Sequence, residues 1–297
     1  MSLTSFIKEP EVRDRIDEDF PNQGQSASNP IAAEWQTNNY MLIGTAFDYL
    51  VRFWLRRNAD TYSARPWIAE SSLEIAFDEF PEIADEIEAI IDDAKQRRDD
   101  YLQSGTLSRP LIQAAIDLAR IDGIYRGGRV PSDLGQYDDA DIVDCLRLFE
   151  ILDTNAVLDG ENVVLNPTFG FGSHAIGGAD ADCILDGKLV DIKTTGNAAF
   201  KPDYWRQLVG YMTLADIHNT LYQTGMYDRY QLDEEPLPEI ESFGIYFARH
   251  GEFETVPASV IYDADAYPEF RSWFVKTVFE VFDSFSPPLR QEIEMMI

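Results

Sequence analysis

GGADADCILDGKLVDIKTTGNAAFKPDYWRQLVGY, the stretch from Gly177 to Tyr211, predicts a strand, a tight turn, a second strand and a helix. Asp186-Gly187 between two apolar-rich runs is a strong signal for a two-residue hairpin loop. With that loop, Leu185 lies opposite Lys188. Counting outward pairs Ile184 with Leu189, Cys183 with Val190, Asp182 with Asp191, and Asp180 with Lys193.

Four charged residues of this hairpin fall on one face, because side chains alternate between the two faces of a strand. They are Asp180, Asp182, Asp191 and Lys193. Directly opposed side chains are about 5 Å apart at Cβ, and like charges at that distance repel. A divalent cation would relieve the repulsion, since Mg²⁺ uses one or two carboxylates when it also holds a phosphate. Lys193 would stand beside the metal, where it can stabilise phosphoryl charge or orient a water.

The alternative is a solvated hairpin face with scattered charges. Apolar residues argue against it, because Ile184 and Leu189 share the face with the acids while Cys183, Val190 and Ile192 make the other face apolar. A strand that is apolar on both faces is usually buried. Buried unpaired carboxylates are costly, so these acids are candidates for a functional site.

The run from Asp182 through Asp191-Ile192-Lys193 resembles the motif of the PD-(D/E)XK nuclease superfamily. Gln207-Leu-Val-Gly-Tyr211 resembles the Q-x-x-x-Y motif of its RecB-like exonuclease branch. The resemblance implies that Asp182, Asp191 and the backbone carbonyl of Ile192 hold Mg²⁺ or Mn²⁺. It also implies that Lys193 acts on the attacking water or the scissile phosphate. Gln207 and Tyr211 would contact the nucleic acid or support the site.

Two further acids are candidates for the metal site. Gly177-Gly178-Ala179-Asp180 matches the Gly-x-x-Asp spacing of RecB-like sequences, so Asp180 is an alternative to Asp182, which the hairpin register favours. Such enzymes also resemble this chain in an early helix with Gly-x-x-x-(His or Glu), and Gly44 and Asp48 stand at that spacing. The alternative role for Asp48 is an ion pair with Arg52 at i,i+4.

Arg120, Arg126 and Arg129 cluster near Tyr125 in IDGIYRGGRV. Basic residues interleaved with an aromatic suit the backbone of a single strand, which makes them weak candidates for nucleic-acid binding. The alternative is a set of solvated arginines.

The order of elements predicts an α/β fold. Helices are expected at Tyr40–Arg57, Ser72–Phe77, Ile83–Leu102, Pro110–Tyr125, Ala140–Leu152, Pro202–His218 and Tyr267–Phe285, and further strands at Ala156–Leu165, Ser242–Arg249 and Phe253–Ile261. The resemblance implies a restriction-endonuclease-like core, a small mixed β-sheet flanked by helices, over residues 153–297. Residues 40–152 form a helical region that includes the first core helix and joins the same compact unit, and residues 1–39 are a loose lead, partly loop.

The composition is strongly acidic, with 53 Asp and Glu against 24 Lys and Arg and a net charge of −29. This charge opposes long-range attraction to nucleic acid. It would also suit a protein dissolved in concentrated salt, so a halophilic source is a hypothesis. Two cysteines cannot supply the four ligands of an iron–sulfur cluster, and no nucleotide-binding loop occurs. Without a signal segment or a long apolar run, a cytoplasmic protein with no membrane association is expected.

The expected function is therefore a Mg²⁺- or Mn²⁺-dependent deoxyribonuclease, exonuclease-like, in DNA repair, recombination or defence. DNA, single- or double-stranded, is the expected partner, with a helicase or another repair or defence protein as a further one. The alternative is a catalytically silent subunit with a nuclease fold that binds nucleic acid or a protein.

Overall fold

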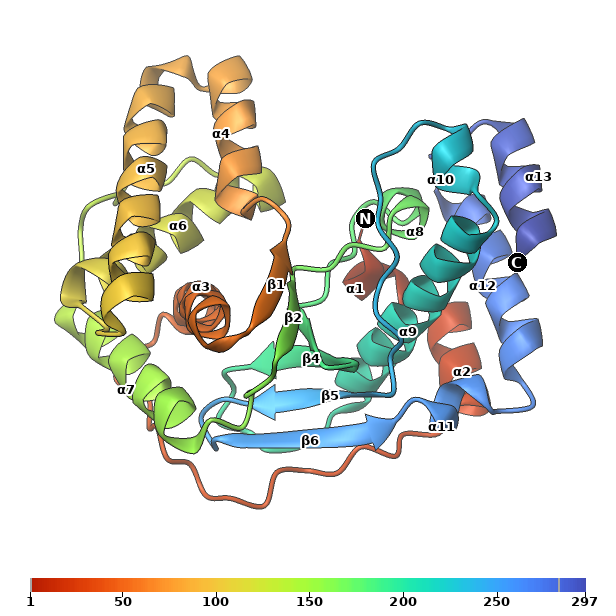
Figure 1. The fold of residues 1–297 in the computed structure, drawn as a ribbon, viewed down its shortest axis with the longest axis horizontal. Coiled ribbons are helices and arrows are strands. Elements are labelled where there is room, and N and C mark those ends of the chain that lie inside the picture. The colour runs from red at the N-terminus through yellow and green to blue at the C-terminus, as the bar shows by residue number, and fades with distance from the viewer. Residues whose placement is uncertain (1, 283) are drawn as a thin grey trace.

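The fold is mixed α/β, with a six-stranded sheet flanked by helices (Figure 1). The computed structural model describes residues 2–282 and 284–297. The strands lie in the order of the sequence: β1 (Thr61–Ala64), β2 (Asn162–Leu165), β3 (Cys183–Leu185), β4 (Lys188–Lys193), β5 (Ser242–Phe247) and β6 (Glu252–Pro257). β1 pairs with β2 and β4 with β5 in parallel, and the other neighbours are antiparallel. The predicted α/β class is confirmed.

Helices make up two groups, one on each side of the sheet (Figure 1). The first comprises α3 (Tyr40–Asn58), α4 (Ile68–Glu79), α5 (Pro81–Ser104), α6 (Arg109–Gly127) and α7 (Asp139–Asn155). The second comprises α1 (Leu3–Phe6), α2 (Pro10–Asp19), α8 (Phe171–Ala175), α9 (Pro202–Gln223), α10 (Met226–Arg229), α11 (Ser259–Tyr262), α12 (Tyr267–Val281) and α13 (Pro287–Met296).

The hairpin of β3 and β4 has the predicted turn and inner register. Leu185 lies opposite Lys188, and Cys183 opposite Val190. Asp186 and Gly187 have φ values of 44° and 75°, the left-handed conformation that a two-residue hairpin loop of this kind needs. Both carboxylate oxygens of Asp186 accept hydrogen bonds from backbone N–H groups at residues 161 and 162. The local sequence thus predicts this turn, and hydrogen bonds from the segment that enters β2 hold it.

The outer part of the predicted register does not form. β3 begins at Cys183, and the segment before it does not pair with β4 but runs beside residues 166–168. Asp180 forms an isolated bridge with Thr168, so it does not pair with Lys193. Asp182 is joined to β4 by its side chain, since its Oδ2 accepts a 2.6 Å hydrogen bond from the backbone N–H of Ile192. A non-local partner strand competes for this segment, which the hairpin sequence does not reveal.

Each face of the sheet has its own apolar core. Ile184 and Leu189 belong to the core shared with α9 and α12, whereas Cys183 and Val190 belong to the core shared with the group from α3 to α7. This division follows the alternation of side chains along a strand. The central strands are therefore buried on both sides, as their two apolar faces predict.

The N-terminal lead is more ordered than expected. Its first part forms α1 and α2, whose apolar side chains Leu3, Phe6, Val12 and Ile16 are buried in the core with α9 and α12. Short helices of low average hydropathy owe their stability to such packing, so the lead sequence alone predicts only a loose segment with one short helix and a loop after it. The segment after Phe20 remains without regular secondary structure up to Asn39.

Other elements differ mainly in length. β2 is shorter than the expected Ala156–Leu165 strand, and Ser259–Tyr262, expected as the end of a strand, is the helix α11. β1, α8, α10 and α13 were not expected. Across residues 2–282 and 284–297, no helix combines the length and the apolar character that crossing a membrane requires.

Candidate active site

Asp191 and Lys193 share one face at the carboxyl end of β4. They are separated by one residue, so strand alternation turns both side chains towards α9. The Lys193 Nζ lies 2.5 Å from Asp191 Oδ2, and the side chains are only 21% and 5% exposed. The two charges are thus held close together in a largely desolvated place.

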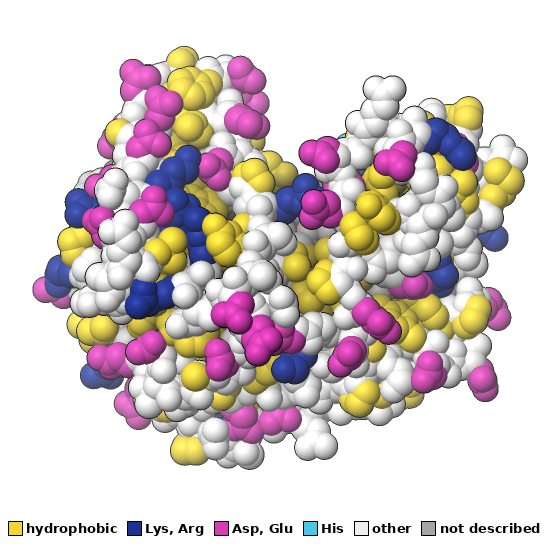
Figure 2. Space-filling model, in the orientation of Figure 1, with side chains coloured by type: hydrophobic (Ala, Val, Ile, Leu, Met, Phe, Trp, Pro, Cys, Tyr) yellow, Lys and Arg dark blue, Asp and Glu magenta, His cyan; other side chains and the backbone are white. Residues whose placement is uncertain are grey.

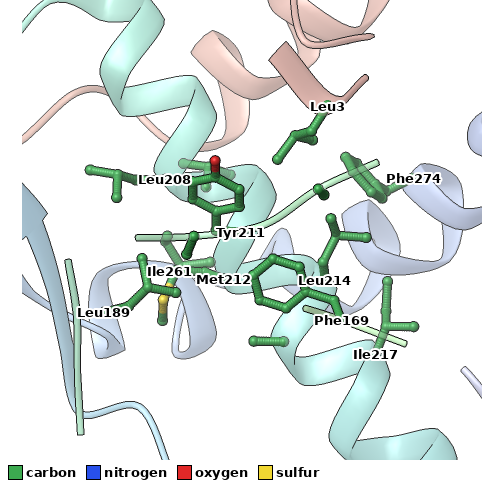
Figure 3. Close-up of a cluster of buried hydrophobic side chains, with 14 of the residues drawn as sticks. Leu3, Phe169, Leu189, Leu208, Tyr211, Met212, Leu214, Ile217, Ile261 and Phe274 are labelled. Atoms are coloured by element: carbon green, nitrogen blue, oxygen red, sulfur yellow. The ribbon is translucent and has the colours of Figure 1, made fainter. Parts of the chain in front are cut away.

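Gln207 and Tyr211 extend this pair from α9. Lys193 Nζ donates to Gln207 Oε1 at 3.3 Å, and Gln207 Nε2 donates to the Tyr211 hydroxyl at 2.8 Å. The spacing of four residues puts both side chains on one helix face. In Figure 3 the Tyr211 ring lies among the apolar side chains, with its oxygen at their border. The ring stacks on Phe169 at a centroid distance of 5.6 Å, so packing fixes the end of this polar chain.

Charges around the β4 end are strongly coupled. Burial raises the pKa of Asp191 to about 6; Lys193 opposes this shift, and Asp182 adds to it. Burial alone would lower the pKa of Lys193, but Asp191 and Asp182 outweigh that effect and raise it. Lys193 therefore remains a cation near neutral pH. As a permanent cation it is suited to stabilising negative charge and not to acting as a base.

Asp48 lies near this cluster and forms the ion pair expected at i,i+4 with Arg52. Burial raises the pKa of Asp48 to about 7, with Arg52 opposing and Asp182 adding to the shift. Its Oδ1 is buried without a hydrogen-bond partner among the described residues. A Cβ on Gly44 would lie 3.1 Å from Thr194 Oγ1, so the small residue permits α3 to approach the end of β4.

Asp180 occupies the rim of the cluster. Its side chain reaches solvent, although neighbouring protein atoms desolvate it enough to raise its pKa, against the effect of Arg126. Asp182 is half-buried and lies closer to Asp191, as its hydrogen bond to Ile192 indicates. Asp122, which the sequence did not single out, accepts a 2.7 Å hydrogen bond from Tyr49 and has its pKa raised to about 6, chiefly by burial.

The three arginines near Tyr125 are not equivalent. Arg120 is largely buried, with ion pairs to Asp117 and Asp133. Arg126 is exposed and lies 4.0 Å from Asp122, which places it near the acidic cluster. Arg129 is exposed beyond the end of α6. Arg126 is therefore the member of the trio that the structure brings towards the candidate site.

Several residues near Lys193 were not identified from the sequence. Tyr204, one turn before Gln207, has its ring centroid 5.1 Å from Lys193 Nζ. Thr194 and Thr195 border a hollow together with Trp35 of the lead and Tyr40 of α3. In the sequence, Trp35 and Tyr40 are simply two aromatic residues within six positions of a polar segment. Such a pattern is too common to indicate a site.

The donor set of the site is small. Within residues 2–282 and 284–297, no group of three or more His, Cys, Asp or Glu side chains is arranged to hold a metal ion. Asp182 and Asp191, together with the carbonyl of Ile192 in β4, remain as a set of two carboxylates and one backbone oxygen. Mg²⁺ binds such sets when waters and substrate phosphates supply its other ligands.

Comparison with known proteins found no matching family model, no similar curated protein and no similar solved structure.

Proposed function

We propose that the chain is a metal-dependent nuclease that hydrolyses DNA phosphodiester bonds, of the RecB-like branch of the PD-(D/E)XK superfamily. The observation that carries this proposal is the continuous polar chain Asp191–Lys193–Gln207–Tyr211. Asp191 and Lys193 lie on β4, and Gln207 and Tyr211 lie on α9, yet the four side chains are in contact one after another. The resemblance implies the same four residues. The mixed sheet with helices on both faces is compatible with a restriction-endonuclease-like core.

The residues fit a divalent cation. Two carboxylates, Asp182 and Asp191, lie near a single lysine. Burial raises the pKa of Asp191 to about 6, and the nearby charge of Asp182 adds to this shift, so a cation at this place would favour the ionised form of both acids. Asp182, Asp191 and the Ile192 carbonyl would hold Mg²⁺ or Mn²⁺. Such an ion supplies Lewis-acid stabilisation of phosphate oxygens when bound. Asp180 and Asp48 are the further acids near enough to modulate the charge of this site.

Lys193 has the central role among the side chains. As a buried cation it stabilises the charge that builds on the phosphate oxygens, and in a desolvated place this interaction is stronger than in water. Gln207 orients the ammonium through its Oε1, and Tyr211 fixes Gln207 in turn. Gln207 and Tyr211 thus position Lys193 for the reaction.

The second candidate function is a catalytically silent subunit that binds nucleic acid or a protein. The internal pairing of charges favours it, because Lys193 compensates Asp191 and Arg52 compensates Asp48 without any ligand. The net charge of −29 also weakens attraction to DNA. Action in repair, recombination or defence beside a helicase, and a cytoplasmic location, stay predictions.

A cleavage assay separates the two. End-labelled single- and double-stranded DNA is incubated with Mg²⁺ or Mn²⁺ at low and high KCl, with wild type and with Lys193→Ala. Wild type is expected to degrade DNA and Lys193→Ala to be inactive. Tyr211→Phe should lose about fivefold in rate, since a lost hydrogen bond is worth about 1 kcal/mol. Lys188→Ala is the matched control, because Lys188 lies on the same strand but is exposed at the turn.

Metal binding is measured on the same proteins by calorimetry. Mn²⁺ should bind wild type and not Asp191→Ala. If folded wild type neither cuts DNA nor binds Mn²⁺ under any of these conditions, the nuclease proposal is wrong and the silent subunit replaces it.

A further inference from the structure

A hollow of about 350 Å³ opens beside the end of β4. It is lined by Trp35, Tyr40 and Met41 from the lead and α3, and by residues 192–195 at the end of the strand. Lys193, the cation of the candidate site, is among these lining residues. The volume lies at the lower end of the range for small-molecule pockets, enough for one nucleoside-sized group.

The aromatic wall of this hollow is held rigidly. The Trp35 and Tyr40 rings meet edge to face, with centroids 4.5 Å apart. The Arg249 guanidinium lies 3.1 Å from the Trp35 ring and is itself fixed by Asp144 and by the carbonyl of Thr194. A Cβ on Gly196 would come within 3.1 Å of Trp35 Nε1, so the backbone after β4 lies close to the indole. Trp35 is therefore positioned before any ligand arrives.

The entrance of the hollow exposes apolar groups. Tyr40 is 49% exposed and Met41 is 88% exposed, on the first turn of α3. On a surface dominated by carboxylates, these groups offer a flat aromatic ring and a polarisable thioether. Every nucleobase has a π-face that stacks on such groups without regard to its identity.

Positive charge lies next to the aromatic wall. The Nζ atoms of Lys193 and Lys201 are 5.1 Å and 5.3 Å from the Tyr204 ring centroid, so both cations flank one side chain. The chain has only six lysines, at positions 8, 95, 188, 193, 201 and 276. Lys193 lines the hollow that presents stacking surfaces, and Lys201 shares the Tyr204 ring with it. This pairing of cation and aromatic is complementary to a phosphate and the base attached to it.

We propose that Trp35, Tyr40 and Met41 form a base-stacking subsite for one unstacked nucleobase of the strand whose phosphate lies at Lys193. A base inside a duplex is already stacked on both faces and cannot enter the hollow. The subsite therefore selects a single-stranded segment or an unpaired end as substrate. This inference rests on the proposed nuclease function and specifies its substrate.

The test measures binding without cleavage. A short fluorescein-labelled oligothymidylate is titrated in EDTA by fluorescence anisotropy, beside a strand of equal length whose sugars are abasic, and a duplex. Wild type should bind oligothymidylate about tenfold more tightly than the abasic strand. Tyr40→Ala combined with Met41→Ala should bind both strands equally, with the abasic strand and the duplex bound as by wild type.

Tyr40→Phe is the matched control, since it keeps the ring and loses only the hydroxyl that donates to Asn38. It should retain the preference for oligothymidylate. Because Tyr40 and Met41 are exposed, thermal melting should show all variants folded as wild type.

The outcomes distinguish the two proposals. If wild type binds the abasic strand as tightly as oligothymidylate, or if the double variant keeps the wild-type preference, the subsite is wrong while cleavage by wild type still supports the nuclease. If wild type binds no polynucleotide and cuts none, the nuclease proposal fails and this inference fails with it.

Discussion

Burial and one or two close partners set the protonation state of the residues at the candidate site. Lys193 stays charged because two carboxylates outweigh its desolvation, while Tyr211 has its pKa raised well above the usual value, chiefly by burial, and stays protonated. The polar chain at the candidate site thus consists of a fixed cation, an amide and a neutral hydroxyl. Such a set orients charge without exchanging protons near neutral pH.

For His218, burial outweighs the nearby charges and lowers the pKa, which leads to a prediction about stability and pH. It is fully buried, with Nδ1 2.8 Å from the Tyr227 hydroxyl and Nε2 2.8 Å from the Glu235 carbonyl, which assigns the neutral Nε2–H form. Burial lowers its pKa below 6.5, although Glu234 opposes this. The unfolded chain therefore binds a proton below pH 6.5 that the folded chain does not. The contribution of His218 to the free energy of unfolding is full above pH 6.5 and is lost as the pH falls.

The measurement compares wild type with His218→Gln by urea denaturation at several pH values. His218→Gln should be less stable at about pH 8 by about 1–3 kcal/mol, because the Tyr227 hydroxyl loses its partner. The gap should narrow towards about pH 5, by at most about 1.4 kcal/mol per pH unit. Buried carboxylates titrate in both proteins and cancel in the difference. A gap that is constant with pH would show that His218 does not titrate differently on folding.

At the scale of elements, Arg249 connects segments that are far apart in the sequence. It follows β5 and is completely buried. Its guanidinium donates to Asp144 of α7, to the carbonyl of Thr194 after β4 and to the carbonyl of Ala33 in the lead. One buried side chain thus joins a helix, two strand ends and the lead, next to the Trp35 wall.

This connection predicts a large stability loss in Asp144→Ala. The substitution leaves the Arg249 charge buried and unpaired, a change that costs about 3–5 kcal/mol. The double variant Asp144→Leu with Arg249→Met removes both charges and should lose less than the single variant. Chemical denaturation of the three proteins measures both effects. Equal losses in the single and double variants would mean that packing, and not the unpaired charge, is responsible.

At the scale of the whole molecule, acidic residues dominate. The chain has 53 Asp and Glu against 24 Lys and Arg, and in Figure 2 acidic side chains are scattered widely over the face shown. Mutual repulsion among surface carboxylates destabilises a compact state, because folding brings them closer together. The two cores on either side of the sheet must outweigh this repulsion.

Salt should therefore stabilise the fold. Between about 0.1 M and about 1 M KCl the screening length falls from about 10 Å to about 3 Å, which removes most repulsion between exposed carboxylates. The melting temperature, followed by circular dichroism, is expected to rise over this range. Asp85→Asn with Glu86→Gln and Glu88→Gln, exposed positions of α5, should melt higher in dilute buffer and respond less to salt. A melting temperature independent of KCl would contradict both the repulsion and a halophilic origin.

Sequence alone determined the features that depend on neighbouring residues. Asp186-Gly187 sets the turn because both residues tolerate positive φ, and strand alternation divides the flanking residues between two cores. Apolar periodicity and the Gly, Ser and Pro residues between segments predicted α3, α5, α6, α7 and α9, because these signals are local in sequence. The α/β class followed from these elements. Asp191, Lys193, Gln207 and Tyr211 were identified from their spacing before their contacts were known.

Tertiary structure decided everything that depends on distant partners. β1 is a short strand that pairs with β2 a hundred residues later, and Asp180 leaves the hairpin for Thr168. The lead packs into the core through Leu3 and Phe6, and Trp35 lines the same hollow as Lys193. Such contacts arise from packing between remote segments, whose loop-closure entropy and burial no local pattern encodes. The sequence therefore predicted which residues form the candidate site, and the fold determined their distances, charges and neighbours.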